Sequence, residues 1–344
     1  MATFEQMQLG VHIGQQNMSM DEMRALWRRA DDEGLDWISV WDHLYEAPPA
    51  GGTIPHFEAI ACLGALAADT QRARLGCLVF YVGYRNPGLL AKAATTIDHI
   101  SGGRFELGLG GGWHEWEAEA YGYDFPSVGE RLDMLDEAAG LITSYFTNDR
   151  TTHDGEYFRA SNASMLPAPV GGTMPLWIGG VGEKRTLRIA ARCADGWNAA
   201  YISPDEFGRL NDVLDAHCAD LGRDPSTIER SINVMFDLGR SHADLAAQWG
   251  PMWERVSGGS LNGSPEDAVQ RLLEYPGTPV RTWSTSPSAR RSTATWSTPT
   301  SARPSRRSGR PSRMPEVLAP RVPRGVRRGT GGEPEPACQL AVAS

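Results

Sequence analysis

The sequence of 344 residues lacks the features of a membrane or secreted protein. No apolar run approaches the roughly 18–20 residues that cross a bilayer, and the mean hydropathy is −0.37. The first ten residues hold neither the basic region nor the apolar region of a signal peptide. The five cysteines are odd in number and show no CxxC spacing, which argues against a disulfide framework or a zinc site. We therefore expect a cytoplasmic protein with no bound metal and no membrane partner.

Several catalytic signatures are also missing. The chain has no GxSxG nucleophile elbow, no Walker loop and no HExxH pair. None of its glycine-rich segments is a GxGxxG with an acidic residue about 20 positions later, as a Rossmann nicotinamide site requires. Serine hydrolases, P-loop enzymes, zinc proteases and Rossmann dehydrogenases are therefore not expected.

Charge and composition divide the chain in two. Residues 277–344 hold 12 Arg, no Lys and 3 Glu, whereas the rest of the chain is acidic enough to bring the net charge to −9. An acidic body is not expected to bind nucleic acid by charge. We therefore treat residues 1–276 as one domain and residues 277–344 as a separate tail.

The tail has no Phe, Tyr, Ile, Asp, Asn, Lys or His, and it follows neither helical nor strand periodicity. Such a segment cannot bury enough apolar surface to order itself, so we expect it to be disordered and to carry no site residue. It could be a basic arm for nucleic acid or an acidic partner, a disordered extension, or the product of a reading-frame shift in high-GC coding DNA. We favour the frameshift, because the composition changes abruptly at the end of an amphipathic helix.

Residues 1–276 alternate between short apolar strands and amphipathic helices, with an inserted hairpin or loop at 148–170. Strands that alternate with helices form parallel sheets, and seven such units indicate a TIM-type (β/α)8 barrel. The eighth unit would fall in the tail, so we expect it to be missing and the first and seventh strands to have unpaired edges. The expected strands are 9–13, 37–41, 74–80, 104–109, 176–178, 196–199 and 231–238; the expected helices are 19–34, 57–68, 87–100, 128–145, 183–194, 205–221 and 265–275.

Chemistry in such barrels lies at the carboxyl ends of the strands, and motifs at those ends resemble a known family. The motifs are Ser39-Val40-Trp41-Asp42-His43, the strand at 75–79 with Tyr84-Arg85-Asn86-Pro87, Gly102-Gly103-Arg104-Phe105 with the strand to Gly110, Trp177-Ile178-Gly179-Gly180-Val181-Gly182-Glu183-Lys184, and Ala194-Asp195-Gly196-Trp197-Asn198. Over residues 8–275 the chain resembles the bacterial-luciferase-like oxidoreductases, in the branch that uses coenzyme F420. The resemblance implies F420 as cofactor, with FMN as the alternative.

The glycine-rich strand ends suggest where a cofactor would bind. Gly179, Gly180, Gly182 and Glu183 lie between a strand and a helix, where backbone N–H groups can hold a phosphate. The same residues could form only a tight turn. Gly111 and Gly112 would admit the ribityl or phosphate part closely. The resemblance implies that Leu78 and Val79 carry a non-proline cis peptide under the cofactor ring.

Asp42 and His43 are the expected catalytic pair, because an imidazole with a pKa near 6.5 suits proton transfer at neutral pH. His12 is a second histidine candidate. Trp113, His114 and Glu115 follow the fourth strand, where the sugar-phosphate dehydrogenases of the family have a glutamate directly after the glycines. This departure leaves open whether acid chemistry shifts to Glu115 or His114 or is absent. Trp113 and Trp116 could form an aromatic wall for an apolar substrate, or they could belong to the core.

Three functions are compatible with these features. The first is hydride transfer between F420 and a small organic substrate, the second an FMN-dependent monooxygenase, and the third an inactive or truncated paralogue. A homodimer is possible in each case.

Overall fold

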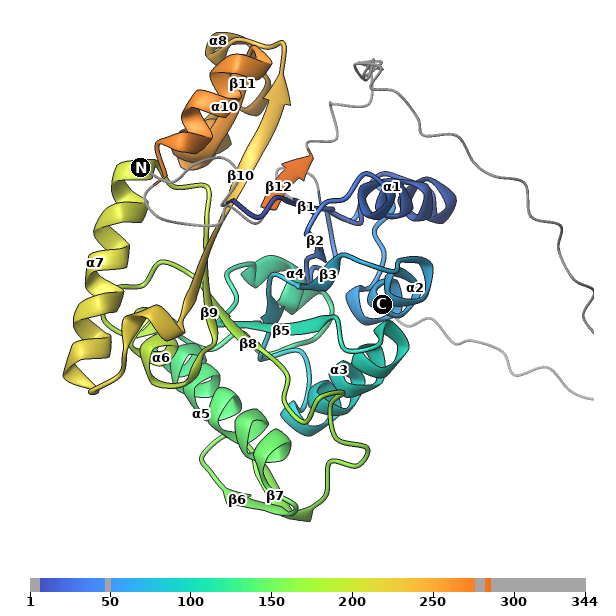
Figure 1. The fold of residues 1–344 in the computed structure, drawn as a ribbon, viewed down its shortest axis with the longest axis vertical. Coiled ribbons are helices and arrows are strands. Elements are labelled where there is room, and N and C mark those ends of the chain that lie inside the picture. The colour runs from blue at the N-terminus through green and yellow to red at the C-terminus, as the bar shows by residue number, and fades with distance from the viewer. Residues whose placement is uncertain (1–6, 47–50, 276–281, 286–344) are drawn as a thin grey trace, which may run out of the picture. The chain divides into compact units, whose positions relative to one another are not determined.

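We describe a computed structural model of the chain, in which residues 7–46, 51–275 and 282–285 are described. All of these residues belong to one unit that spans residues 1–293. Parallel strands occupy its centre and helices surround them (Figure 1). This architecture confirms the expected α/β barrel. Among the described helices, none has the length and apolar character needed to cross a membrane.

The barrel strands follow one another by parallel pairing around a closed ring, because β9 pairs with β10 as well as with β8. The short strand β4 (Phe80–Tyr81) pairs with β5 beside this ring. In ring order the barrel strands are β1 (Gly10–His12), β2 (Trp37–Val40), β3 (Arg74–Cys77), β5 (Phe105–Gly110), β8 (Leu176–Gly179), β9 (Gly196–Ala200), β10 (Glu229–Leu238) and β12 (Thr282–Thr285).

The sheet corrects one expectation, that the first and seventh strands have unpaired edges. β12 pairs in parallel with both β10 and β1, with Trp283 opposite Val234 on one side and Val11 on the other. These pairs are made by backbone N–H and C=O groups, so a strand can close the ring without an apolar run in its sequence. A helix that would complete an eighth unit, and the remainder of the predicted tail, lie outside the described residues.

Helix boundaries follow local signals in the sequence. Ser19 and Glu22 form a capping box at the start of α1, as Ser127 and Glu130 do for α5. Asn86 caps α3, which begins with Pro87 at its first position. The helices around the barrel are α1 (Met20–Asp32), α2 (Ala59–Asp69), α3 (Pro87–Ser101), α4 (Glu115–Ala120), α5 (Val128–Thr147), α6 (Thr186–Cys193), α7 (Pro204–Asp220) and α10 (Pro265–Leu273).

Two insertions extend the barrel. The expected hairpin in 148–170 is confirmed as antiparallel β6 (Thr151–Asp154) and β7 (Arg159–Ala163). A second insertion after β10 was not anticipated. It contains α8 (His242–Trp249), α9 (Pro251–Val256) and β11 (Ser260–Gly263), and β11 pairs with the carboxyl end of β10. This second insertion therefore lies at the end of the barrel where chemistry is expected.

Large apolar side chains fill the space between the strands and the helices. Trp197 stacks on Phe207 of α7 with ring centroids 5.4 Å apart, and Tyr275 packs edge-on against the same ring. All three side chains are buried. Burial of such side chains stabilises a fold by about 1.5–3 kcal/mol each, so this contact fixes α7 and the end of α10 on the sheet.

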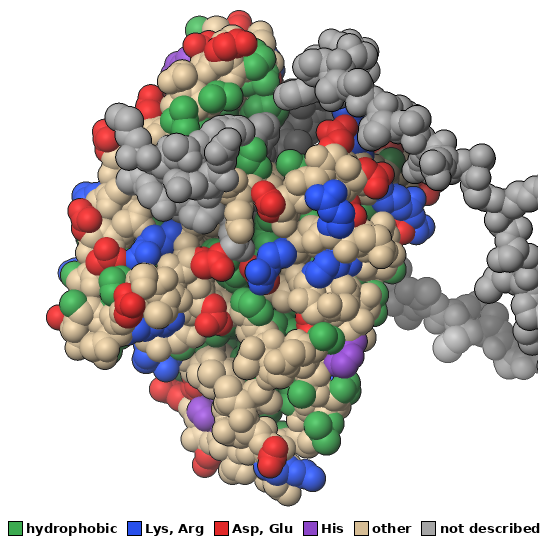
Figure 2. Space-filling view, in the orientation of Figure 1, with side chains coloured by type: hydrophobic (Ala, Val, Ile, Leu, Met, Phe, Trp, Pro, Cys, Tyr) green, Lys and Arg blue, Asp and Glu red, His purple; other side chains and the backbone are tan. Residues whose placement is uncertain are grey.

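Acidic and basic side chains are interspersed on the face drawn in Figure 2. Ion pairs join neighbouring outer helices, such as those of Arg185 with Asp133 and of Arg192 with Asp136 of α5. Exposed pairs of this kind contribute about 0–1 kcal/mol each. The helices are therefore held mainly by the apolar contacts beneath them.

Candidate active site

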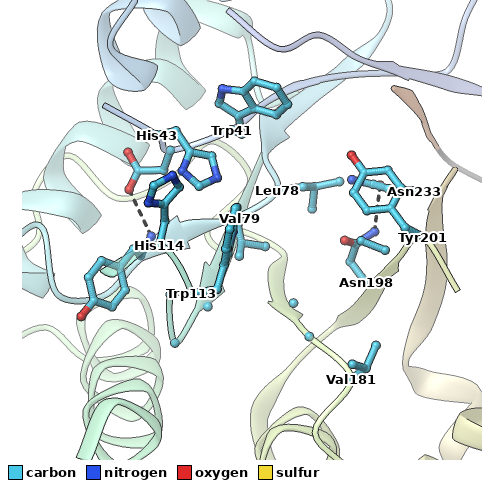
Figure 3. A pocket seen from close by; sticks show the side chains of 18 of the residues that line it. Trp41, His43, Leu78, Val79, Trp113, His114, Val181, Asn198, Tyr201 and Asn233 are labelled. Carbon is cyan, nitrogen blue, oxygen red and sulfur yellow. Dashed lines mark hydrogen bonds between the residues drawn. The ribbon is translucent and has the colours of Figure 1, made fainter. Parts of the chain in front are cut away.

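A cavity of 620 Å³ opens at the carboxyl ends of the barrel strands. Its lining comes from the ends of β1, β2, β3, β5, β8, β9 and β10 and from the insertion after β10. In Figure 3, His43 and His114 lie on one side, Asn198, Tyr201 and Asn233 lie on the other, and Leu78 and Val79 lie between them. The volume is that of a typical small-molecule or cofactor site.

His43 lies directly beyond β2 and contacts a carboxylate that the sequence did not single out. Its Nδ1 is 2.6 Å from Oε1 of Glu117 on α4. An ionised carboxylate only accepts hydrogen bonds, so Nδ1 of His43 carries a proton and donates it. The other ring nitrogen, Nε2, is then the one left for a proton acceptor or donor role in the cavity.

Glu117 is buried and surrounded by donors. Oε1 also accepts from the Tyr84 hydroxyl at 2.9 Å, and Oε2 accepts from the backbone N–H groups of Leu44 and Tyr45 at 2.9 and 3.1 Å. Burial alone would raise the pKa of Glu117, but the hydrogen bonds from His43 and from these backbone groups outweigh it and lower the pKa to about 2. The carboxylate therefore stays ionised and fixes the position of the His43 ring.

Asp42 lines the same cavity but its carboxylate is engaged elsewhere. Oδ2 accepts from Nη1 of Arg85 at 2.7 Å and from the backbone N–H of Tyr81 at 3.1 Å. Burial raises the pKa of Asp42, while Arg85 opposes the shift. These contacts tie the end of β2 to the segment after β3, which is a positioning role beside His43.

His12, at the end of β1, also lines the cavity. Its Nδ1 is 2.8 Å from the hydroxyl of Ser39. Burial, followed by the nearby His43, lowers the pKa of His12 to about 3. The ring is therefore neutral at physiological pH.

The Leu78–Val79 peptide bond is cis, as the family resemblance implied. The Val79 side chain lies among glycines at the ends of two neighbouring strands. A Cβ on Gly110 would stand 2.4 Å from Val79 Cγ2, and one on Gly179 would stand 2.7 Å from Cγ1. Real Cβ atoms do not approach this closely, so glycine is needed at both positions for Val79 to occupy the floor of the cavity.

The segment after β8 lines the cavity only in part. Gly179, Gly180 and Gly182 line it, and Gly180 has a φ of +127°, which favours glycine. Thr186, at the start of α6, lines it as well and is buried. Glu183 does not: its carboxylate accepts from Arg209 on α7 at 2.9 Å and faces solvent. The sequence thus predicted the glycines of this segment but placed one acidic residue too many in the cavity.

The residues after β5 divide in the same way. Gly111, Gly112, Trp113 and His114 line the cavity, whereas Glu115 is exposed as the first residue of α4. His114 caps this helix, since its Nδ1 accepts from the backbone N–H of Glu117. Besides Asp42, the acidic residue that lines the cavity is therefore Glu117, two positions beyond Glu115 on the same helix. The i, i+3 spacing from the capping His114 is the signal in the sequence that could have indicated it.

The insertion after β10 contributes an apolar wall. Trp249, Met252 and Val256 line the cavity together with Met235 at the end of β10, and Arg255 lies with its guanidinium 6.0 Å from the Trp113 ring. Arg131 of α5 is a second arginine in the lining. It donates to the backbone carbonyls of Gly111 and Pro126 and lies 3.8 Å over the Phe125 ring.

Comparison with known proteins agrees with this geometry. A family model for luciferase-like monooxygenases matches residues 1–304. The chain belongs to this family. The F420-dependent glucose-6-phosphate dehydrogenase of Nocardia farcinica is 30% identical over 255 residues, which cover 73% of this chain and 74% of that protein.

Two solved structures share the fold of this luciferase-like protein. An F420-dependent secondary alcohol dehydrogenase in complex with an F420–acetone adduct matches with a TM-score of 0.73 at 18% identity, over 81% of this chain and 93% of the other. A type II Baeyer–Villiger monooxygenase of Pseudomonas putida in complex with FMN matches with a TM-score of 0.63 at 16% identity, over 81% and 91%. At these identities the two matches establish the fold of the family member and no more.

Proposed function

We propose that this luciferase-like protein binds coenzyme F420 in the cavity and transfers a hydride between it and a small organic substrate. The observation that carries the proposal is the His43–Glu117 pair, which presents one imidazole nitrogen to a glycine-lined cavity at the barrel's carboxyl end. The name of the Nocardia relative supports F420 as the cofactor.

The residues present fit a flat cofactor that carries a phosphate. Glycine at the ends of β5 and β8 lets Val79 and Tyr81 lie close to the backbone; a Cβ on Gly112 would stand 2.5 Å from the Tyr81 ring, so this position cannot hold a larger residue. Gly180, Gly182 and the Thr186 hydroxyl lie together at the start of α6, where backbone N–H groups and a hydroxyl suit a phosphate. We assign the ring to the space above Val79 and the phosphate to the segment from Gly180 to Thr186.

When bound, a deazaflavin supplies a two-electron carbon centre that accepts or donates hydride. The protein's part is to hold and move the accompanying proton. With Nδ1–H donated to Glu117, Nε2 of a neutral His43 can take a proton from a substrate hydroxyl, and the protonated ring can return it to a carbonyl. Asp42 and Arg85 keep the end of β2, and with it His43, in position.

An FMN-dependent monooxygenase is the second candidate, because a structure of this fold holds FMN. The third, an inactive paralogue, was suggested by the expected open edges of the barrel. The pairing of β12 with β1 and β10 removes that argument at the level of the backbone.

Titration of the purified full chain with F420 and, separately, with FMN tests the proposal. We expect quenching of F420 fluorescence at micromolar protein and weaker binding of FMN. Gly180→Asp places a carboxylate where we assign the phosphate and should abolish binding of F420. Gly172→Asp is the matched control, because Gly172 also has a positive φ but lies outside the cavity. Equal F420 affinity in both variants would contradict the assigned site.

A further inference from the structure

Trp41 follows the end of β2 and lines the cavity beside His43 (Figure 3). The indole is half-buried and meets the His43 ring edge to face, with ring centroids 5.7 Å apart. His12, at the end of β1, also meets the indole edge-on, at a centroid distance of 5.7 Å. One tryptophan therefore contacts histidines from two neighbouring strand ends.

Gly14 makes room for this indole. A Cβ at Gly14 would stand 2.3 Å from Cη2 and 2.5 Å from Cζ2 of Trp41. Real Cβ atoms do not approach this closely, so the benzene ring of the indole lies directly against the chain that follows β1. The φ of Gly14 is not positive, so its backbone conformation alone does not require glycine. Glycine at this position is the complement of Trp41.

Two further contacts hold Trp41 in place. The buried Gln15 side chain donates from Nε2 to the Trp41 carbonyl at 2.6 Å, and its Oε1 accepts from the Trp41 N–H at 3.2 Å. The indole Nε1–H donates to Nε2 of His56 at 2.8 Å, and the planes of the two rings differ by only 7°. Because its backbone, its N–H group and its benzene ring are all fixed, the indole is a rigid boundary of the cavity.

His12 lies behind this boundary. It lines the cavity, yet only 2% of it is exposed. Gly14, which the indole covers, follows His12 by two residues toward the carboxyl end of β1, where the cavity opens. Trp113 also contacts His43, with centroids 5.4 Å apart, but it is exposed and borders the mouth of the cavity. A molecule beside His43 therefore meets the Trp41 indole before it reaches His12.

We infer that Trp41 determines the size of the molecule that the cavity accepts, because its indole stops a substrate bound beside His43 from extending toward His12. The inference rests on the proposed function in that the bound molecule is a substrate. It predicts that a smaller side chain at position 41 opens the cavity toward β1 and admits larger molecules.

Cysteine labelling tests this boundary without cofactor or substrate. The His12→Cys variant of the full chain is treated with methyl methanethiosulfonate or with the bulkier benzyl methanethiosulfonate, and modification of residue 12 is followed by mass spectrometry. Val181→Cys is the control for the intrinsic reactivity of the two reagents, because Val181 lines the cavity and is exposed. Relative to this control, we expect the methyl reagent to react with residue 12 at least about tenfold faster than the benzyl reagent.

Trp41→Leu should remove this difference, because leucine leaves the space over Gly14 open. The same preference with and without Trp41→Leu would overturn the inference. So would the absence of a preference while Trp41 is present, or a thiol at position 12 that neither reagent reaches in either background. Gly14→Ala checks the contact itself: it should lower the melting temperature when Trp41 is present and have little effect in the Trp41→Leu background. Equal losses in both backgrounds would contradict the packing of the indole on Gly14.

Turnover connects the boundary with specificity. With F420, we expect Trp41→Leu to raise kcat/KM for cyclohexanol relative to 2-propanol at least about tenfold, with little change in F420 affinity. An unchanged ratio would overturn the role in specificity even if the labelling behaves as expected. Absent F420 binding by the unsubstituted protein refutes the proposed function. In that case, or if neither alcohol reacts, the labelling result alone decides whether Trp41 limits the cavity.

Discussion

Replacing Glu117 by glutamine should stop Nε2 of His43 from acting as a base, while the new side chain still fills the space of the old one. The carboxylate accepts two donors on each oxygen: His43 and Tyr84 on Oε1, and the Leu44 and Tyr45 backbone on Oε2. A glutamine has one oxygen and one NH2 group. The backbone N–H groups cannot turn away, so the amide oxygen must face them and the NH2 group must face His43 and Tyr84.

That orientation reverses the tautomer of His43. The Tyr84 hydroxyl can rotate to accept a hydrogen bond, and His43 can avoid two opposed N–H groups only by moving its proton from Nδ1 to Nε2. The cavity then contains a donor where it had an acceptor. Loss of a positioned general base costs about 10²–10⁴-fold in rate, so we expect kcat to fall by that factor. Imperfect pairing should destabilise the fold by about 1–3 kcal/mol, while F420 affinity should change little.

The assay is steady-state turnover with F420, together with nitrogen-15 spectra that report which nitrogen of His43 is protonated. Glu115→Gln is the control, because Glu115 lies on the same helix but is exposed and outside the cavity. It should behave like the unsubstituted protein. Wild-type kcat in Glu117→Gln, or an unchanged His43 tautomer, would refute the reasoning.

Other predictions follow from the same contacts. His43→Ala should lower kcat about 10²–10⁴-fold in steady-state assays and leave the dissociation constant for F420 nearly unchanged; wild-type turnover would make His43 a packing residue. Gly110→Ala should unfold at a lower temperature in a thermal melt, because its Cβ would overlap Val79, whereas Gly64→Ala has open space at its Cβ and should not. The pKa values of His12 and His56 are lowered to about 3 and about 4, mainly by burial. As the pH falls below 6.5, the unfolded chain gains protons that the folded chain excludes, so the free energy of unfolding should drop by about 1.4 kcal/mol per pH unit for each ring. Urea unfolding at several pH values should show a shallower drop for His12→Gln, and an unchanged slope would argue against a neutral buried His12.

The alternation of strands and helices predicted the barrel, and the strand ends predicted most of the cavity, because both depend on local periodicity and on a general rule for parallel barrels. Glu115 and Glu183 were placed in the site by their position in the sequence alone. A helix beginning at Glu115 turns that residue outward and brings Glu117 inward, a difference that depends on where the helix starts.

Two other features depend on long-range contacts. The wall formed by Trp249 and Met252 belongs to an insertion whose position is set by the pairing of β11 with β10. The strand Thr282–Thr285 is polar in sequence and is defined by its backbone partners in β10 and β1. A pattern of apolar residues reports neither of these contacts.

Hydride exchange with F420 is the central claim, and one measurement tests it most directly. The F420-loaded protein is mixed with each of a series of small alcohols in the absence of other acceptors, and the visible absorbance of the oxidised deazaflavin is followed over time. The account predicts loss of this absorbance with at least one alcohol, its return with an excess of the matching carbonyl compound, and no oxygen uptake. Stable absorbance with bound F420, together with oxygen uptake when reduced FMN and the same substrate are supplied, would contradict it and identify a flavin monooxygenase instead.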